Sequence, residues 1–372
     1  MIALVVIIGL GVAIWLQRLV YNRFWSRNLS VEMSFSKKTA VEGATVVLLE
    51  SLSNAKPLPL PWVAVKFQVS KYLNFTDNLN SKITDDYYRN DLFSVMMYRK
   101  ITRRLPFVCA KRGYYTVKSL DLVSGNILMN SKYAAQFDCR AALTVYPSLI
   151  PLGGLDAVFA NLTGSVLTRR FIHPDPFEFK GIREYQPYDT FRSINFKATA
   201  KTGDLMVNMN DYTVSRQVIL LLNLERSHDW RDDLLDEQAI RLAATLAERF
   251  VAQGVPVRFI TNGPDVSTGL VSDLPEGSGA GHLNNIYEVL ARIDLLRETP
   301  PFAGMLTAAA LARKAEPLYV LISEYHRDDL AEAFLRLGET GAEAVWILPR
   351  RAAEPVALNK NLEGKVTEWE VK

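Results

Sequence analysis

The chain has 372 residues, of which 49% are hydrophobic and 22% are charged. These fractions exclude an intrinsically disordered chain and a fibrous repeat, and the length suits two or three folding units. Lysine and arginine exceed aspartate and glutamate by only three, 43 against 40. Nucleic-acid-binding domains usually carry a strongly basic face, so we predict no nucleic-acid partner. The two cysteines exclude a disulfide-stapled scaffold.

The first predicted element is a membrane anchor over residues 1–20. Residues 2–16 carry no charge, and extension to Val20, with Arg18 reaching the headgroups, gives the ~20 residues that a bilayer requires. No basic residue precedes the apolar run and no small-x-small site follows it, so we expect an uncleaved anchor rather than a signal peptide. Basic residues cluster on the C-terminal side, and the positive-inside rule then predicts a single-pass protein of the cell membrane with cytoplasmic domains.

Alternation of apolar and polar residues predicts an all-β, sandwich-like domain over residues 28–148. The alternation is clearest at 29–35 and 63–69, and further strands are expected at 46–49, 98–104, 114–123 and 143–146. Residues 74–90 are polar and are expected to form a long loop. The basic residues between 99 and 112 predict either a solvated strand face or a patch attracted to anionic headgroups.

After residue 216 the pattern changes to alternating strands and helices, which predicts a doubly wound, mostly parallel α/β domain over residues 215–372. Buried strands are expected at 217–224, 255–261, 318–323 and 344–348, with an edge strand at 366–371. Helices are expected at 236–253, 282–296 and 327–337.

A connecting segment over residues 149–214 joins the two domains, and its most informative part is 177–207, which interleaves charged and aromatic residues. One interpretation is a docking surface for a protein, with guanidinium groups offered to carboxylates. The other is an internal network of ion pairs and stacked rings that holds the segment against the α/β domain. The sequence leaves both open.

The segment contains a regular series of glycine, charged, aromatic and small residues: Phe179, Gly181, Arg183, Tyr185, Pro187, Asp189, Arg192, Ile194, Lys197, Ala198, Ala200, Gly203 and Leu205. With these residues the segment resembles the signature of the domain of unknown function 58 family. Three positions differ from that signature: Tyr188 stands for glycine, Asn195 for aspartate and Phe196 for tryptophan.

The resemblance implies a chain with an N-terminal anchor, a β-rich region, the signature and a von Willebrand factor A-like α/β domain. Members are often encoded beside MoxR-type AAA ATPases, which implies a role in assembling cell-envelope or metal-containing complexes and makes such an ATPase the expected protein partner. The residues expected to bind the partner or to shape the signature are Gly181, Arg183, Tyr185, Asp189, Arg192 and Lys197.

The von Willebrand factor A resemblance also implies a possible Mg²⁺ or Ca²⁺ site, which that fold holds through a D-x-S-x-S loop after its first strand. Here Asn223 and Glu225 replace the first two ligands and only Ser227 is retained, while Glu324 follows a later strand. We therefore expect a degenerate pocket without a cofactor, with Mg²⁺ bound through Asn223, Ser227 and Glu324 as the alternative.

Catalytic signatures are absent from the sequence: it contains no GxxxxGK[ST], HExxH or GxSxG motif, and its four histidines lack ligand spacing. The expected function is therefore a membrane-anchored, non-enzymatic accessory protein. The alternatives are an envelope-associated hydrolase that uses carboxylates such as Glu184 and Asp189, and an extracellular adhesion module.

Overall fold

The computed structural model of the chain describes residues 2–77, 81–151, 179–210, 217–226, 232–311, 317–339, 342–351, 360–362 and 364–371. The chain divides into two compact units. The first comprises Met1–Ser148 with Leu290–Arg292, and the second comprises Leu149–Val289 and Ile293–Lys372.

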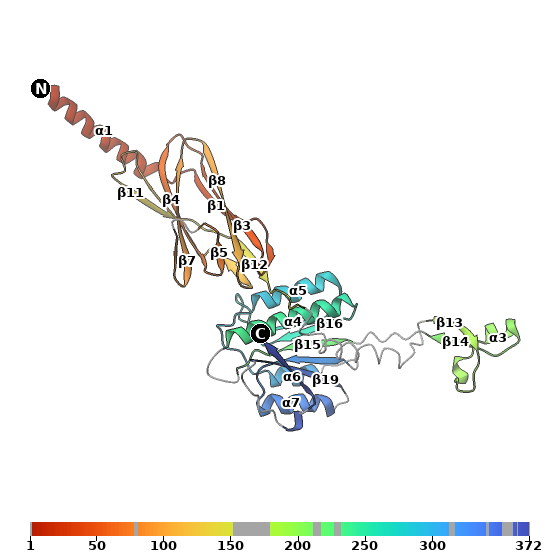
Figure 1. Cartoon of the computed structure of the whole chain (residues 1–372). Coiled ribbons are helices and arrows are strands. Elements are labelled where there is room, and N and C mark those ends of the chain that lie inside the picture. Colours follow the sequence, from red (N-terminus) through yellow and green to blue (C-terminus); the bar gives the residue numbers. More distant parts are fainter. Residues whose placement is uncertain are drawn as a thin grey trace. The chain divides into compact units, whose positions relative to one another are not determined.

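The chain begins with the apolar helix α1 (Ile2–Phe24), shown in red in Figure 1. Its stretch Ala3–Phe24 is long and apolar enough to cross a membrane, and an 18-residue apolar segment within it is not buried by the rest of the protein. The helix ends four residues beyond the predicted anchor because it continues through Tyr21 to Phe24. Unlike the exposed residues before them, Tyr21 and Trp25 pack in the core of the β domain, where they are 1% and 6% exposed.

The β domain is a sandwich of two antiparallel sheets around one apolar core, as the alternation predicts. One sheet has the order β1 (Leu29–Phe35), β3 (Thr45–Asn54), β8 (Arg99–Cys109) and β5 (Leu73–Phe75). The second has the order β11 (Lys132–Gln136), β10 (Ser119–Gly125), β4 (Leu60–Ser70), β7 (Asp86–Val95) and β6 (Ser81–Ile83). A small third sheet joins β2 (Thr39–Val41), β12 (Ala142–Tyr146) and β9 (Gly113–Thr116).

The prediction of a loop over residues 74–90 is wrong, because β5, β6 and the start of β7 lie there. In β7 the inward-facing positions include Tyr87, Arg89 and Asp91, which are all buried. Charged side chains at buried positions hide the apolar alternation by which strands are recognised. The strand expected at 114–123 is also divided, since β9 and β10 belong to different sheets.

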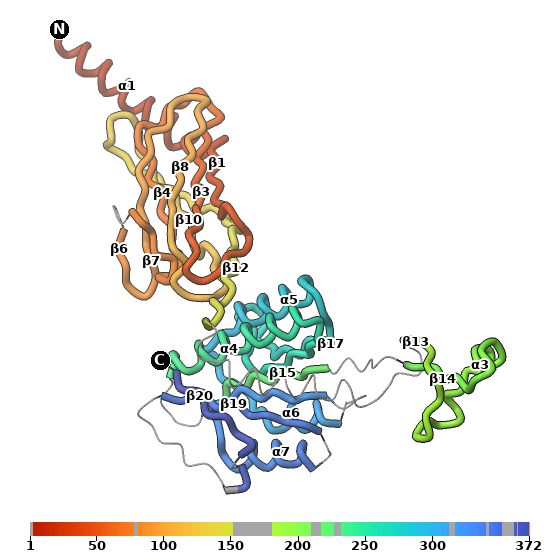
Figure 2. Tube along the Cα trace, turned by 45° about the vertical axis from the view of Figure 1, so that its right-hand side comes forward, coloured from red at the N-terminus to blue at the C-terminus, as the bar shows by residue number. Residues whose placement is uncertain are grey.

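The α/β region is a doubly wound sheet of order β17–β16–β15–β18–β19–β20, in which only β17 is antiparallel to its neighbour. Figures 1 and 2 show α4 and α5 on one face of the sheet, and α6 and α7 on the other. The strands are β15 (Val218–Leu222), β16 (Val257–Thr261), β17 (Ser272–Gly277), β18 (Leu318–Ile322), β19 (Glu343–Arg351) and β20 (Val366–Val371). The helices are α4 (Asp233–Ala252), α5 (Gly279–Arg292), α6 (Ala303–Leu311) and α7 (Asp328–Glu339).

Burial on both faces explains why β15 and β18 are continuous apolar runs with every residue buried. The sequence predicted the four parallel strands, the edge strand β20 and helices α4, α5 and α7. It missed α6 and β17. Strand β17 carries the sequence SDLPEG, which has no strand pattern, and it pairs only along one edge with β16.

Candidate functional site

The family signature folds into a small structure of its own. Strands β13 (Phe179–Glu184) and β14 (Met206–Asn210) form an antiparallel pair, and between them lie the 3-10 turn η2 (Phe191–Ser193) and helix α3 (Phe196–Thr202). We call residues 179–210 the signature hairpin. Asn195 caps α3 by accepting a hydrogen bond from the Ala198 amide at 2.9 Å, and Gly203, at φ +86°, ends the helix.

Arg183 and Asp189 close the turn that follows β13. The two guanidinium nitrogens of Arg183 donate to the two carboxylate oxygens of Asp189, each at 2.6 Å, and the Gln186 amide donates to the same carboxylate at 2.8 Å. The Arg183 hydrogen bonds hold the pKa of Asp189 below its usual value. The Arg183 guanidinium also lies 5.5 Å from the ring centre of Tyr188. This bidentate pair explains why the signature carries an arginine and an aspartate six residues apart.

The outer surface of the signature hairpin carries large aromatic side chains. Tyr188, Phe191 and Phe196 are 78%, 77% and 75% exposed. Such exposure of three aromatic rings within nine residues is unusual for a surface without a binding role. Arg192 and Lys197 are exposed beside them, and neither forms an ion pair with the residues that the structure describes.

The predicted signature residues therefore divide into two groups. Arg183 and Asp189 bind each other, and the half-buried Tyr185 packs with its ring centre 6.3 Å from that of Phe191. Gly181 lies in β13 at a break in the strand register, and a Cβ there would meet only ordinary contact distances, so space does not explain the glycine. The exposed group contains Arg192 and Lys197.

Sequence reasoning missed the importance of Tyr188, Phe191 and Phe196, although it noted aromatic residues throughout the segment. An available signal was that Tyr188 and Phe196 both stand at positions where the family pattern differs. Exposure itself could not be read from the sequence, because aromatic residues are ordinarily assigned to a core.

The second candidate site lies where the neighbouring strands β15 and β18 end. The connection after β15 leads to β16 and the connection after β18 leads to β19, on opposite sides of this point in the sheet. In doubly wound sheets such a switch point commonly holds a ligand. Here the side-chain Nδ2 of Asn223 donates to the Ser323 hydroxyl at 3.0 Å, and the Oδ1 of Asn223 accepts a hydrogen bond from the side-chain Nδ2 of Asn262 at 2.8 Å. The exposed fractions of Asn223, Asn262 and Ser323 are 2%, 0% and 0%. Hydrogen bonds between these neutral side chains thus link the ends of β15, β16 and β18.

Acidic groups stand beside this network. The Glu225 carboxylate accepts a hydrogen bond from the Phe302 amide at 3.1 Å, and burial raises its pKa. The Tyr325 hydroxyl donates to Asp329 at 3.0 Å. Glu324 follows β18 and is half-buried, whereas Ser227 lies outside the described residues. Within the described residues, no three acidic, histidine or cysteine side chains are grouped to hold a metal ion. The predicted degenerate pocket stays a prediction.

The comparisons with known proteins bear on the signature hairpin and the α/β sheet together. Residues 181–354 match the family model described as "Protein of unknown function DUF58". This region is a DUF58 domain. The match begins in β13 and continues beyond the end of β19, so the signature hairpin belongs to the same domain as the doubly wound sheet. A comparison with curated proteins found no match.

Among solved structures, the chain shows similarity to three cohesin domains, each over about a third of its length. The seventh ScaB type I cohesin from Pseudobacteroides cellulosolvens is 15% identical, over 33% of this chain and 95% of that one, with a TM-score of 0.22. A non-cellulosomal cohesin from Archaeoglobus fulgidus is 10% identical, over 35% and 97%, with a TM-score of 0.22. A type II cohesin from Acetivibrio cellulolyticus is 9% identical, over 32% and 95%, with a TM-score of 0.24.

Proposed function

We propose that this protein is a membrane-anchored, non-enzymatic accessory protein that binds a protein partner through the exposed aromatic residues of its signature hairpin. The family resemblance makes a MoxR-type AAA ATPase the expected partner. The observation that carries the proposal is the exposure of Tyr188, Phe191 and Phe196 around a turn held rigid by Arg183 and Asp189. Interface centres are enriched in aromatic and arginine side chains, and a preorganised turn loses little entropy on binding.

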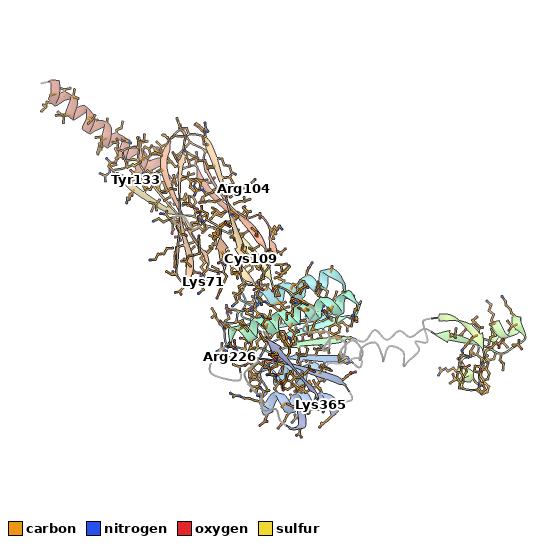
Figure 3. All side chains as sticks on the ribbon, in the orientation of Figure 1. Lys71, Arg104, Cys109, Tyr133, Arg226 and Lys365 are labelled. Atoms are coloured by element: carbon orange, nitrogen blue, oxygen red, sulfur yellow. The ribbon has the colours of Figure 1, made fainter. Side chains whose placement is uncertain are left out.

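The attachment of α1 to the β domain supports a permanent anchor. In the helical stretch Ala3–Phe24, the residues before the buried Tyr21 give about 27 Å of helix at 1.5 Å per residue, close to a bilayer core of about 30 Å. The Tyr21 hydroxyl donates to the Pro59 carbonyl at 2.6 Å, and the Trp25 ring stacks on Tyr133 with 6.0 Å between centres. Figure 3 labels Tyr133 beside the end of α1. A cleaved signal peptide is removed from the mature protein, so a segment that continues into the core of the β domain favours an uncleaved anchor.

Three features support a non-enzymatic role over the alternative of a hydrolase that uses Glu184 and Asp189. Asp189 is bound by Arg183 and its pKa is lowered, whereas a general acid needs a raised pKa. Glu184 is exposed to solvent, whereas catalytic acids and bases are commonly held in buried clefts. The switch point of the α/β sheet, the usual place for a ligand in this fold, is filled by the side chains of Asn223, Asn262 and Ser323.

Co-purification with a MoxR-type ATPase of the same organism tests the proposal. The Phe191→Ser, Phe196→Ser double variant should lose the ATPase at least tenfold, because both rings leave the proposed interface. Leu296→Ser is the matched control, since Leu296 is an 87% exposed apolar residue of the α/β region. Equal recovery of the ATPase with the wild type, the double variant and the control would overturn the docking role of the signature hairpin.

A further inference from the structure

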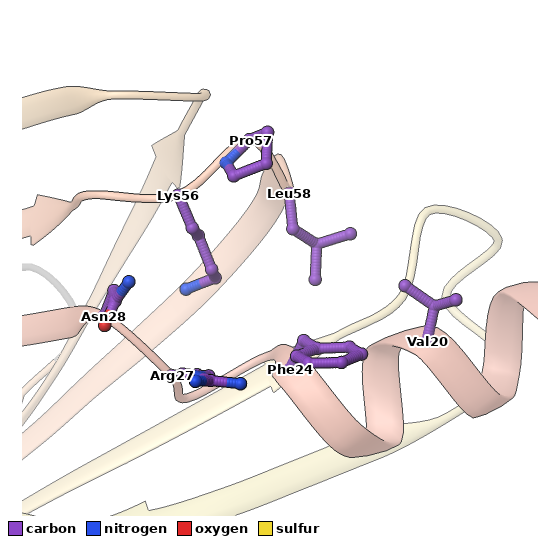
Figure 4. Close-up of a pocket in the computed structure, with 7 residues that line it drawn as sticks. All are labelled: Val20, Phe24, Arg27, Asn28, Lys56, Pro57 and Leu58. Atoms are coloured by element: carbon purple, nitrogen blue, oxygen red, sulfur yellow. The ribbon is translucent and has the colours of Figure 1, made fainter.

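A cavity of about 370 Å³ lies within the first unit, where α1 enters the β domain. It is formed by the end of α1, the turn that follows it and the connection between β3 and β4. Figure 4 shows apolar side chains at the end nearer α1, and the side chains of Arg27, Asn28 and Lys56 at the other. Its lining residues are Val20, Phe24, Arg27, Asn28, Lys56, Pro57 and Leu58.

Lys56 is the unusual member of this set. The residue is only 5% exposed, and its Nζ is buried without a hydrogen-bond partner among the described residues. Burial alone lowers the pKa of Lys56 to about 8, with no carboxylate acting in the opposite direction. A buried ammonium group without a partner is costly, so a lining cation of this kind indicates an anion that is not part of the chain.

Arg27 adds a second cation to the same end of the cavity. It is exposed, its guanidinium lies 5.9 Å from the ring centre of Phe24, and it forms no ion pair with the described part of the chain. Two carbonyls at the end of α1 are hydrogen-bonded without Lys56. The carbonyls of Tyr21 and Phe24 accept hydrogen bonds from the Trp25 and Arg27 amides at 2.9 and 3.3 Å.

Two exposed apolar loops flank the cavity. Met96, Met97 and Tyr98 are 49%, 52% and 70% exposed, and the Tyr98 amide donates to the Lys56 carbonyl at 3.4 Å. In the β10–β11 loop, Ile127, Leu128 and Met129 are 54%, 51% and 64% exposed. The Tyr133 hydroxyl in β11 donates to the Arg18 carbonyl of α1 at 3.4 Å, which ties that hairpin to the helix. Apolar loops around a spanning helix suit the interface of a bilayer, not water.

We propose that this cavity binds one anionic glycerophospholipid, with its phosphate against Lys56 and Arg27 and an acyl chain along Val20 and Phe24. The inference rests on the proposed anchoring of α1. A bilayer phospholipid supplies both halves of the required chemistry, a phosphate for the cations and a hydrocarbon chain for the apolar end. Basic pockets beside membrane helices select anionic headgroups in this way.

Native mass spectrometry of the full chain, reconstituted in nanodiscs of phosphatidylcholine and phosphatidylglycerol and then released into detergent, tests the proposal. The wild type should retain one phosphatidylglycerol. The Lys56→Met, Arg27→Gln double variant should retain at least about tenfold less, because two charge-assisted contacts are removed. Lys56→Met replaces the buried cation with an apolar side chain of similar length, so the variant should fold, which circular dichroism checks. Lys132→Met removes an exposed charge from the adjacent β11 and should retain the lipid.

Two further measurements separate the possible failures. Flotation with phosphatidylcholine vesicles measures anchoring, and a protein that does not float would overturn the proposed function itself. A protein that floats but retains phosphatidylglycerol equally in the double variant and in Lys132→Met would overturn only the lipid site. Stabilisation of the detergent-solubilised protein by inorganic phosphate, to the same extent as by phosphatidylglycerol, would show an anion site that does not require the acyl chain and would also overturn it.

Discussion

Replacing Glu50 with glutamine should remove a pH dependence from the stability of the β domain. Glu50 lies in β3, is fully buried, and stands directly opposite Arg103 of β8. The neighbouring Asp91 carboxylate is also fully buried, and it pairs with Arg89 at 2.7 Å and with Arg103 at 2.8 Å. Burial, followed by the Asp91 charge, raises the pKa of Glu50 from 4.5 to about 8.

The direction of the effect follows from proton binding. Between pH 4.5 and about 8 the folded protein keeps a proton on Glu50 that the unfolded chain releases. The stability from this group is therefore fully present below pH 4.5 and is lost as the pH rises through about 8. The slope is at most about 1.4 kcal/mol per pH unit, so the loss over the window is on the order of 3–5 kcal/mol. Glutamine cannot ionise, so Glu50→Gln should be the more stable protein at the upper end of the window.

Urea unfolding of the full chain in detergent, measured across this pH window, gives the free energy of unfolding. Hydrogen exchange of β3 and β7 peptides assigns the change to the β domain. Glu32→Gln is the control, because Glu32 is an exposed glutamate of the adjacent β1, 3.7 Å from Lys100. The reasoning is refuted if Glu50→Gln and wild type lose stability with pH at the same rate.

Four other predictions concern the remaining sites. Asn223→Asp should destabilise the α/β region by about 1–3 kcal/mol, because it removes the donor to Ser323 and buries a charge. Adding Mg²⁺ to the wild type should leave its melting temperature unchanged. A rise of that temperature with Mg²⁺ would contradict the degenerate pocket. In the native protein a maleimide should label the half-buried Cys139 before Cys109. Cys109 is fully buried, and burial raises the pKa of its thiol to about 11. Labelling of both cysteines at equal rates in the folded protein would contradict this prediction. Arg183→Ala should speed amide exchange at Gln186 by freeing the Asp189 carboxylate, and unchanged exchange there would show that the pair does not hold the turn.

The sequence by itself determined the elements whose residues lie in a regular environment. The apolar run of α1, the alternation in β1 and the all-apolar β15 and β18 are examples of such regular elements. Periodicity reports such environments directly. The family signature was equally visible, because its residues are spaced along one continuous segment.

Only the tertiary structure decided the features that depend on residues far apart in the chain. Strand β7 was hidden because Arg89 and Asp91 are buried beside Glu50 and Arg103, which belong to other strands. Lys56 is buried without a hydrogen-bond partner among the described residues because the fold brings the β3–β4 connection against the end of α1. Within the signature, spacing could not distinguish Arg183, which binds Asp189, from Arg192, which remains exposed. A charged residue in a sequence does not show whether its partner is another side chain, solvent or a separate molecule, since that depends on burial and on contacts that the fold alone creates.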